Sequence, residues 1–411
     1  MPPYANPIET ALRGLIRTGS LEFILPGDRR MILGDGAAPH LTARITDPLA
    51  LAHIAATPYL GVGEAYMDGR LILENGSIRD LLELGARNAA NRPAKPRSGA
   101  LNRWWNTLRD ERISRAAARR NVAHHYDLSV DLYRRFLDAD MQYSCAYFET
   151  PDISLEEAQT AKKRHITAKL DLNPGHTVLD IGCGWGGMAL SMAAWTGARV
   201  DGITLSTEQL KTAQSRAEAE GLATRVRFSL TDYRDVAGRY DRIVSVGMFE
   251  HVGRASYQVF FDKIAALLAD DGVAVIHAIG SSQTPGPVNP FTTKYIFPGA
   301  HVPSLSEVLP AIERAGLRVC DIEILRLHYA ETLRRWSERF AAHRDEIAAL
   351  YDERFCRMWE CYLAGAEMGF RHGGHMNFQL QLTKRVDVLP ITRAYMGEAE
   401  RALAADARRA A

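Results

Sequence analysis

The stretch "VLDIGCGWGG", Val178 to Gly187, decides the fold class of this 411-residue chain. An apolar, strand-like run ends at Asp180, glycines follow at Gly182, Gly184 and Gly186, and the helix-like "MALSMAAWTG" comes next. Glycines let a backbone turn sharply and approach a ligand where a side chain would collide. The spacing D-x-G-x-G-x-G differs from the G-x-G-x-x-G of nicotinamide enzymes. Together with the acid upstream, it favours S-adenosylmethionine as ligand over a purely structural turn.

Strand-like and helix-like segments alternate after this stretch. The segments "ARVDGITLS", "RVRFSLTD", "DRIVSVGMF" and "VAVIHAIG" are strand-like, and "TEQLKTAQSRAEAEGL" and "YQVFFDKIAALLADDG" are helix-like. This alternation predicts an α/β fold with a parallel sheet covered by helices on both faces. Further strands are expected at "VCDIEILRLH" and "HMNFQLQLTKR", with a helical region at 330–370 between them. In the last segment every second residue from Met376 to Leu382 is apolar, which predicts a half-buried edge strand.

The residues before the glycine stretch predict a separate small domain. Short strand-like pieces, "LEFILPG" and "RRMILGDG", precede a helix-like "PLALAHIAATP", which indicates an α+β domain at about 1–90. The Pro-, Gly- and Lys/Arg-rich "NRPAKPRSGA" follows. It predicts a basic linker at 91–120 and a catalytic domain at 121–411.

Composition and charge set limits on the class of protein. The chain is 46% hydrophobic and 24% charged with a net charge of +1, as in ordinary globular proteins. It opens "MPPYANPIETALRG", without a signal-peptide pattern, and no apolar run reaches the ~18–20 residues of a membrane span. Five cysteines without CxxC spacing fit a reducing cytosol and no zinc site.

One segment, residues 87–120, is strongly basic. It holds ten Lys or Arg against two acids, ten minus two giving +8, and the pair Trp104-Trp105. Basic residues beside indole rings suit an anionic lipid surface. A solvated helix face with its tryptophans in the core would explain the same residues. Nucleic acid is not expected as a partner, because no nucleic-acid-binding motif accompanies the charge.

Two apolar strands carry titratable groups that need an explanation. "DRIVSVGMF" runs directly into Glu250 and His251, and "VIHAIGS" holds His277. Buried charges cost free energy unless something pairs with them, so Glu250 lies either in a solvated loop or in a functional site. A strand histidine is usually a satisfied core residue. The spacing of His277 to Ile279 and Gly280 favours a functional role instead.

Several motifs together resemble the cyclopropane fatty acyl phospholipid synthases and the mycolic acid cyclopropane synthases. They are "HYDLSVDLYRRFLDADMQYSCAYF", "VLDIGCGWGG", "GITLSTEQ", "DYRDV", "DRIVSVGMFEHVG", "VIHAIGS", "NPFTTKYIFPGA" and "HYAETLRRW", and they cover about 121–385. "YLGVGEAYMDGRL" resembles the lipid-binding N-terminal domain of full-length bacterial synthases. The resemblance implies a class I, Rossmann-like methyltransferase that transfers a methylene from S-adenosylmethionine to a cis double bond of an unsaturated phospholipid acyl chain. It also implies a cytoplasmic homodimer in peripheral contact with the inner face of the membrane.

The resemblance also implies two sets of site residues. Bicarbonate would accept the proton released on ring closure and would be held by Cys145, Glu250, His277, the backbone of Ile279, and Tyr329. Glu250 would share the proton of the anion, His277 would donate to it and Tyr329 would cap it. His251 is expected to point elsewhere, as a packed or capping residue. The cofactor would be held by Tyr143, Ser144, Asp180, Gly182, Gly184, Gly186, Gly187, Thr204, Leu205, Gln209, Tyr233 and Arg234.

One departure from the family leaves the product open. Many relatives carry a cysteine in a "YLxxC" segment, where this chain has "YLAGAEMGF" with Ala366. We expect this position to line the acyl channel. A changed channel could favour a C-methyltransferase that makes methyl- or methylene-branched chains from the same cation. Two more functions stay open, a non-catalytic lipid-binding protein and a small-molecule methyltransferase, and the second of these leaves the N-terminal domain unexplained.

Overall fold

The computed structural model describes residues 10, 12–91 and 128–410, which form two compact units. The first unit comprises 1–102, 288–298 and 333–374, and the second comprises 103–287, 299–332 and 375–411. The first unit therefore combines the N-terminal region with two later segments of the chain. The sequence-based domain boundaries remain predictions. Most of the predicted basic linker, with Trp104 and Trp105, lies outside the described residues.

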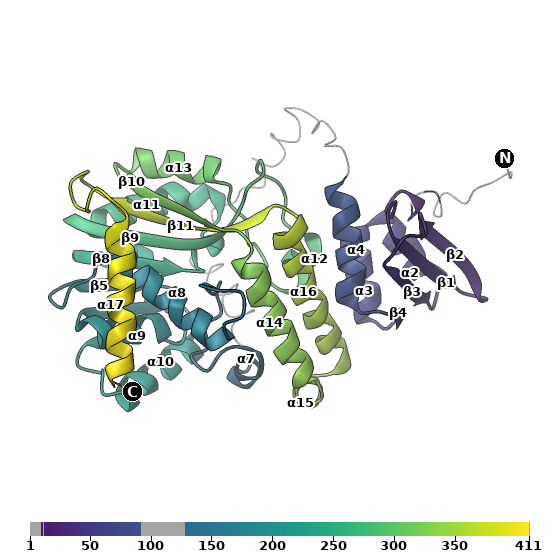
Figure 1. The fold of residues 1–411 in the computed structure, drawn as a ribbon, viewed down its shortest axis with the longest axis horizontal. Coiled ribbons are helices and arrows are strands. Elements are labelled where there is room, and N and C mark those ends of the chain that lie inside the picture. The colour runs from purple at the N-terminus through teal and green to yellow at the C-terminus, as the bar shows by residue number, and fades with distance from the viewer. Residues whose placement is uncertain (1–9, 11, 92–127, 411) are drawn as a thin grey trace. The chain divides into compact units, whose positions relative to one another are not determined.

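The second unit is built on a seven-stranded sheet (Figure 1) with the order β10-β11-β9-β8-β5-β6-β7. Its strands are β5 Thr177–Ile181, β6 Arg199–Thr204, β7 Val226–Leu230, β8 Tyr240–Val246, β9 Leu268–Ser281, β10 Arg318–Leu325 and β11 His375–Thr383. The pairs from β7 through β6, β5 and β8 to β9 are parallel, as the sequence predicts. The sheet is mixed, however, because β11 runs antiparallel to both β9 and β10.

The prediction of a half-buried edge strand at 375–383 is wrong. Strand β11 lies between β9 and β10, and eight of its nine residues are buried. Its alternating polar side chains find partners inside the protein rather than water. Gln379 bonds His277, Gln381 donates to the Lys169 carbonyl, and Thr383 donates to the Arg385 carbonyl. The alternating polar residues of β11 therefore bond to buried partners. A period-two pattern alone does not distinguish such residues from residues that face water.

Helices cover both faces of this sheet and give it two apolar cores. Val178 of β5 packs in a core with α8 Leu155–Lys169, α9 Gly187–Thr196 and α10 Thr207–Ala219. The next residue, Leu179, packs on the opposite face with α11 Tyr257–Leu267 and α13 Leu305–Arg314. Helices cover both sides of β5, so the side chains on both sides of this strand are apolar. This explains why apolar residues follow one another in its sequence. The described part of this unit also contains α7 Val130–Phe136 and α17 Ala394–Ala410, and α17 lies along α8.

The first unit has its own four-stranded sheet (Figure 1), ordered β2-β1-β3-β4. The strands are β1 Ser20–Leu25, β2 Arg29–Gly34, β3 His40–Ile45 and β4 Leu71–Asn75, and the helices include α2 Pro48–Ala56, α3 Pro58–Met67, α4 Ile78–Ala90 and α12 Pro290–Tyr295. The pairs β1–β2 and β3–β4 are antiparallel, and β1–β3 is parallel. These elements confirm the predicted α+β character.

The helical region expected at 330–370 consists of three helices, α14 His328–Ala342, α15 Arg344–Leu350 and α16 Glu353–His372. Within the first unit, α16 packs against α3 and α4. Buried Glu367 of α16 accepts two hydrogen bonds from Arg79 of α4, at 2.8 and 2.9 Å, and one from Arg371. Among the described residues, no helix combines the length and apolarity needed to cross a bilayer.

Candidate active site

The carboxyl ends of the parallel strands surround a cavity in the second unit. The chain order reverses between β5 and its neighbour β8, and such switch points are where open α/β sheets bind ligands. The cavity is lined by residues that follow four neighbouring strands. These are Asp180 to Trp185 after β5, Ile203 to Leu205 at β6, Thr231 to Arg234 after β7, and Val246 to Met248 with His251 and Val252 after β8. Met141 to Ser144, Met188 and Gln209 complete the lining.

Two glycines of the glycine loop lie where a side chain would collide with a neighbouring segment. Gly182 has a φ of +83°, and a Cβ there would lie 2.8 Å from the Cβ of Met248 in the β8 loop. Gly187 begins α9, and a Cβ there would collide with Asp140 and Gln142. Close approach of neighbouring segments therefore favours glycine at both positions, and at Gly182 the backbone conformation favours it as well.

The structure places most of the predicted cofactor residues along this cavity. The lining includes Tyr143, Ser144, Asp180, Gly182, Gly184, Thr204, Leu205, Gln209, Tyr233 and Arg234. Gly186 and Gly187 are not part of the lining. Gly186 has a positive φ and packs closely against the Phe228 ring, and Gly187 is the first residue of α9.

Asp180 provides the strongest sign that the cavity holds a charged ligand. The residue is buried, and one of its carboxylate oxygens has no hydrogen-bond partner within the protein. Burial raises its pKa to about 7, and the nearby Lys162 ammonium group acts in the opposite direction. A buried acceptor without a partner is costly, and a cationic amino group would satisfy it. The site therefore fits the amino-acid end of S-adenosylmethionine.

Two further strand ends shape the cavity through side-chain hydrogen bonds. Thr204 at the end of β6 donates to the side-chain oxygen of Gln209 on α10, at 2.8 Å. After β7, buried Asp232 accepts from the backbone and guanidinium groups of Arg234, with the guanidinium contacts at 2.6 and 2.8 Å. The Arg234 charge is thus neutralised by Asp232, so this arginine shapes the wall rather than adding a free cation.

Glu250 lies in a short 3-10 helix directly after β8, between the cavity-lining Met248 and His251. One of its carboxylate oxygens accepts from the Ile279 backbone N–H at 2.5 Å, and the other is buried without a partner. Burial raises the pKa of Glu250 to about 7, and the Ile279 hydrogen bond opposes this shift. A carboxyl with this pKa holds or shares a proton at neutral pH.

His277 faces β11. Its Nδ1 lies 3.1 Å from the Gln379 amide nitrogen, and its Nε2 lies 3.3 Å from the Asn377 amide nitrogen. The amide oxygens of both residues are buried without partners, so turning one amide would let its oxygen accept the ring N–H. Burial, with the Lys162 charge, holds the pKa of His277 well below its usual range. His277 is therefore a neutral ring held by two amides, and its hydrogen bonds do not include Glu250.

The segments that carry Cys145 and Tyr329 are tied together. The Ala146 N–H donates to Thr332 at 3.1 Å, and the Phe148 N–H donates to His328 at 2.9 Å, both near the start of α14. Buried Cys145 donates its thiol to the Ala146 carbonyl. Burial raises the pKa of this thiol far above its usual range, so Cys145 is not a thiolate nucleophile.

Comparisons with known proteins agree with these features. A family model described as mycolic acid cyclopropane synthetase matches residues 113–380. The chain is 38% identical to the cyclopropane-fatty-acyl-phospholipid synthase of Escherichia coli (strain K12) over 371 residues, 86% of this chain and 90% of that protein. The chain belongs to the mycolic acid cyclopropane synthetase family.

Two other relatives extend the comparison for this family member. A probable fatty acid methyltransferase of Pseudomonas putida is 39% identical over 351 residues, covering 82% of this chain and 86% of that protein. A mycolic acid cyclopropane synthase crystallised with SAH and CTAB has a TM-score of 0.62 and 35% identity, covering 64% of this chain and 97% of that one. Family membership and the class I methyltransferase fold are thus confirmed, and the chain is an S-adenosylmethionine-dependent enzyme.

Some cavity residues are not what the sequence predicted. His251, expected to point away from the bicarbonate and given no contact with the cofactor, lines the cofactor cavity, where burial lowers its pKa to about 4. Gln142, Trp185 and Asp232 also line it and were not predicted. The sequence could have indicated Asp232, because it is an acid at the end of the strand-like "RFSLTD". No sequence pattern indicates Gln142 or Trp185. Within the described residues, no group of three or more His, Cys, Asp or Glu is placed to hold a metal ion.

Proposed function

We propose that this enzyme is a cyclopropane fatty acid synthase. It transfers a methylene from S-adenosylmethionine to the cis double bond of an unsaturated phospholipid acyl chain. The observation that carries this proposal is Glu250, a buried carboxyl beside the cofactor cavity with one unpaired oxygen and a pKa near 7. Ring closure releases a proton from the added carbon, and a buried carboxyl with this pKa is suited to hold the small base that accepts it.

The chemistry explains why the site is buried. An alkene is a poor nucleophile, so it must be held against the reacting methyl group with water excluded. When bound, S-adenosylmethionine supplies that methyl group and bicarbonate supplies a small base. The double-bond electrons form the first new C–C bond as the C–S bond breaks, which leaves a cation on the acyl chain. The added carbon then loses one proton as the second C–C bond closes the ring.

Glu250 is the centre of the proposed proton-accepting site. Two anions in contact must share a proton, and a carboxyl with a pKa of about 7 can carry it. The Ile279 N–H is the kind of donor that an oxyanion uses, and in this structure it donates to Glu250 itself. Cys145 and Tyr329 belong to the proposed ligand set and lie on two segments that the Ala146–Thr332 hydrogen bond joins, and His277 is positioned by its two amides. The unpaired oxygen of Glu250 is the feature that supports a small oxyanion sharing its proton with this carboxyl.

The substrate suggests where the enzyme works. Phospholipid acyl chains lie in a bilayer, so we place the enzyme in the cytoplasm in peripheral contact with the inner face of the membrane. The predicted N-terminal domain at 1–90 and the basic segment with its two tryptophans would make this contact. We expect the working form to be a homodimer.

The second candidate is a C-methyltransferase that makes branched acyl chains from the same cation. Ala366, where many relatives carry cysteine, favours it, as does the similarity to a probable fatty acid methyltransferase. Ala366 is half-buried on α16 of the first unit, and its place in an acyl channel remains a prediction. The chain belongs to a family of S-adenosylmethionine-dependent enzymes, which argues against a non-catalytic lipid-binding protein.

The test is expression in a bacterial host that makes no cyclopropane lipids, followed by fatty acid analysis before and after mild hydrogenation. A product one CH2 heavier than the alkene that takes up no hydrogen supports the synthase. A product of that mass that does take up hydrogen, or a saturated branched chain, supports the C-methyltransferase. An unchanged profile with a folded, SAH-binding protein contradicts both. The matched control is Glu250→Gln, which should bind SAH and give no product.

A further inference from the structure

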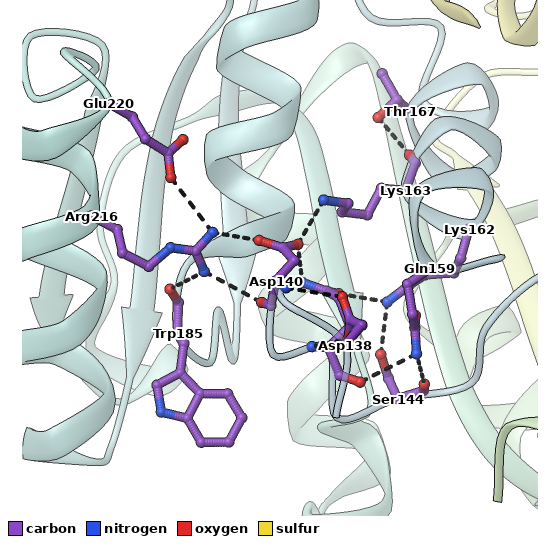
Figure 2. Close-up of polar contacts among 11 residues, drawn as sticks. Asp138, Asp140, Ser144, Gln159, Lys162, Lys163, Thr167, Trp185, Arg216 and Glu220 are labelled. Carbon is purple, nitrogen blue, oxygen red and sulfur yellow. Dashed lines mark hydrogen bonds and ion pairs between the residues drawn. The ribbon is translucent and has the colours of Figure 1, made fainter. Parts of the chain in front are cut away.

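Helix α8 directs a positive charge into the wall of the cofactor cavity. Lys162 lies on this helix with no exposed surface, and Figure 2 shows it pointing toward the segment that holds Ser144. Burying a lysine is costly unless its ammonium group is fully bonded. None of the roles predicted from the sequence involves this residue. Its position therefore calls for an explanation.

Lys162 and Gln159 together clamp the segment that lines one side of the cavity. The Lys162 ammonium group donates to the Gln142 side-chain oxygen at 2.6 Å and to the Ser144 hydroxyl at 2.8 Å. One turn earlier, the Gln159 amide donates to the backbone carbonyls of Gln142 at 3.2 Å and Ser144 at 2.9 Å. Both clamped residues line the cavity with Tyr143 between them. The helix thus fixes this wall by side chain and by backbone (Figure 2).

We propose that Lys162 is a positioning residue for the cofactor: it holds Gln142 and Ser144 in the cavity wall, and its positive charge favours the ionised form of Asp180. This proposal rests on the proposed cofactor site and extends it to a residue that touches no ligand.

Among the described residues around Asp140, the neighbouring cations Lys163 and Arg216 pair with that carboxylate, whereas Lys162 bonds to the cavity wall. Asp140 accepts from Lys163 at 2.6 Å and also bonds Arg216, so these two cations are occupied (Figure 2). The titratable groups that interact with Lys162 come from several elements. They are Asp138, Asp140, Cys145, Lys163, Asp180 and His277. Burial lowers the pKa of Lys162 to about 8, and Asp138 opposes this, so the ammonium form persists at neutral pH.

The charge matters because Asp180 is near its titration point. Burial raises the pKa of Asp180 to about 7, and Lys162 is the charged group that opposes the rise. Cys183 is the other titratable group coupled to Asp180, and its thiol is neutral because burial raises its pKa well above the usual value. Without Lys162, more of Asp180 would be protonated at neutral pH. Its protonated form no longer offers an anion to the amino group of the cofactor.

The experiment measures SAH binding to the full chain by calorimetry between pH 6 and pH 9. The variants are Lys162→Met, which removes charge and hydrogen bonds, and Lys162→Gln, which keeps a donor without the charge. Lys163→Met is the matched control, because it removes the adjacent buried cation of the same helix, which serves Asp140 instead. Asp180→Asn identifies the titrating group, since it should abolish the weakening of SAH binding as the pH falls through about 7, whereas Lys162 titrates higher, at about 8.

In the wild type, SAH binding should weaken as the pH falls through about 7. We expect the midpoint to move up by about 1 unit in both Lys162 variants and to stay in place in Lys163→Met. Lys162→Gln should recover part of the affinity lost in Lys162→Met. An unmoved midpoint in Lys162→Gln overturns the charge role, whether or not Lys162→Met folds. Absence of SAH binding by the wild type would instead contradict the cofactor assignment itself.

Discussion

Replacing Glu250 by glutamine should make the protein more stable while abolishing its activity. In the folded chain, burial raises the pKa of Glu250 from 4.5 to about 7. This difference of about 2.5 units, at about 1.36 kcal/mol per unit, corresponds to about 3 kcal/mol in favour of the protonated form. Glutamine keeps the shape of the protonated carboxyl and cannot ionise. The residue is buried, so solvent screening does not reduce the figure.

The sign of the pH dependence follows from linkage. A group whose pKa is raised in the fold contributes stability below its unfolded pKa, and that contribution is lost as the pH rises through the folded pKa. For Glu250 the loss therefore runs from about pH 4.5 to about pH 7 and is complete above it. The gain in free energy of unfolding on Glu250→Gln should be about 1 kcal/mol at pH 5 and about 3 kcal/mol at pH 8.

The assay is urea unfolding of wild type and variant at both pH values, with infrared spectroscopy of the folded protein. The protonated carboxyl band should lose intensity between pH 6 and pH 9, and at pH 6 it should be weaker in the variant, which keeps only the contribution of Asp180. Glu64→Gln is the control of opposite sign. Burial opposes the ionisation of Glu64, but hydrogen bonds from Lys294, Tyr295 and His53 outweigh it and hold its pKa at about 2. A stability difference independent of pH in Glu250→Gln would refute the reasoning.

Three further predictions concern other parts of the molecule. Gly187→Ala should weaken SAH binding about tenfold, because the new methyl group collides with Gln142. In the control Gly85→Ala the new methyl group meets no neighbour, so SAH binding should stay unchanged. Equal effects of the two substitutions would contradict the collision. Glu367→Gln should lower the free energy of unfolding by about 3 kcal/mol, measured by urea titration, since two arginines lose their buried partner; a neutral effect would refute this. Iodoacetamide and mass spectrometry should show native alkylation of exposed Cys320 and none of Cys145, whose rapid modification would contradict its raised pKa.

The order of strands and helices could be predicted because each signal is local. The glycine stretch, the apolar strands and their intervening helices each depend on a few neighbouring residues. Strand β11 could not be placed, because its position depends on pairing with β9 across a long sequence separation. Its polar residues are buried only through partners such as His277 and the Lys169 carbonyl, which no local pattern identifies.

In the candidate site, too, some residues could be predicted from local sequence signals and others only from the fold. Residues at strand ends, such as Asp180 and Thr204, could be expected because the carboxyl ends of parallel strands meet at one edge. Lys162 could not, because it lies mid-helix among charged residues and resembles a solvated lysine. Only the fold shows that its ammonium group reaches Gln142 and Ser144. Likewise, nothing in the sequence shows that side-chain amides of β11 hydrogen-bond both ring nitrogens of His277.

The central claim is that a cation on the acyl chain closes to a ring when the added carbon loses a proton beside Glu250. The most direct test supplies purified enzyme with unsaturated phospholipid vesicles, bicarbonate and S-adenosylmethionine whose methyl group is fully deuterated. The account predicts a cyclopropane product that has lost one deuterium, formed more slowly when bicarbonate is removed and not formed by Glu250→Gln. A product that keeps every deuterium, or that forms equally well with Glu250→Gln, would contradict it.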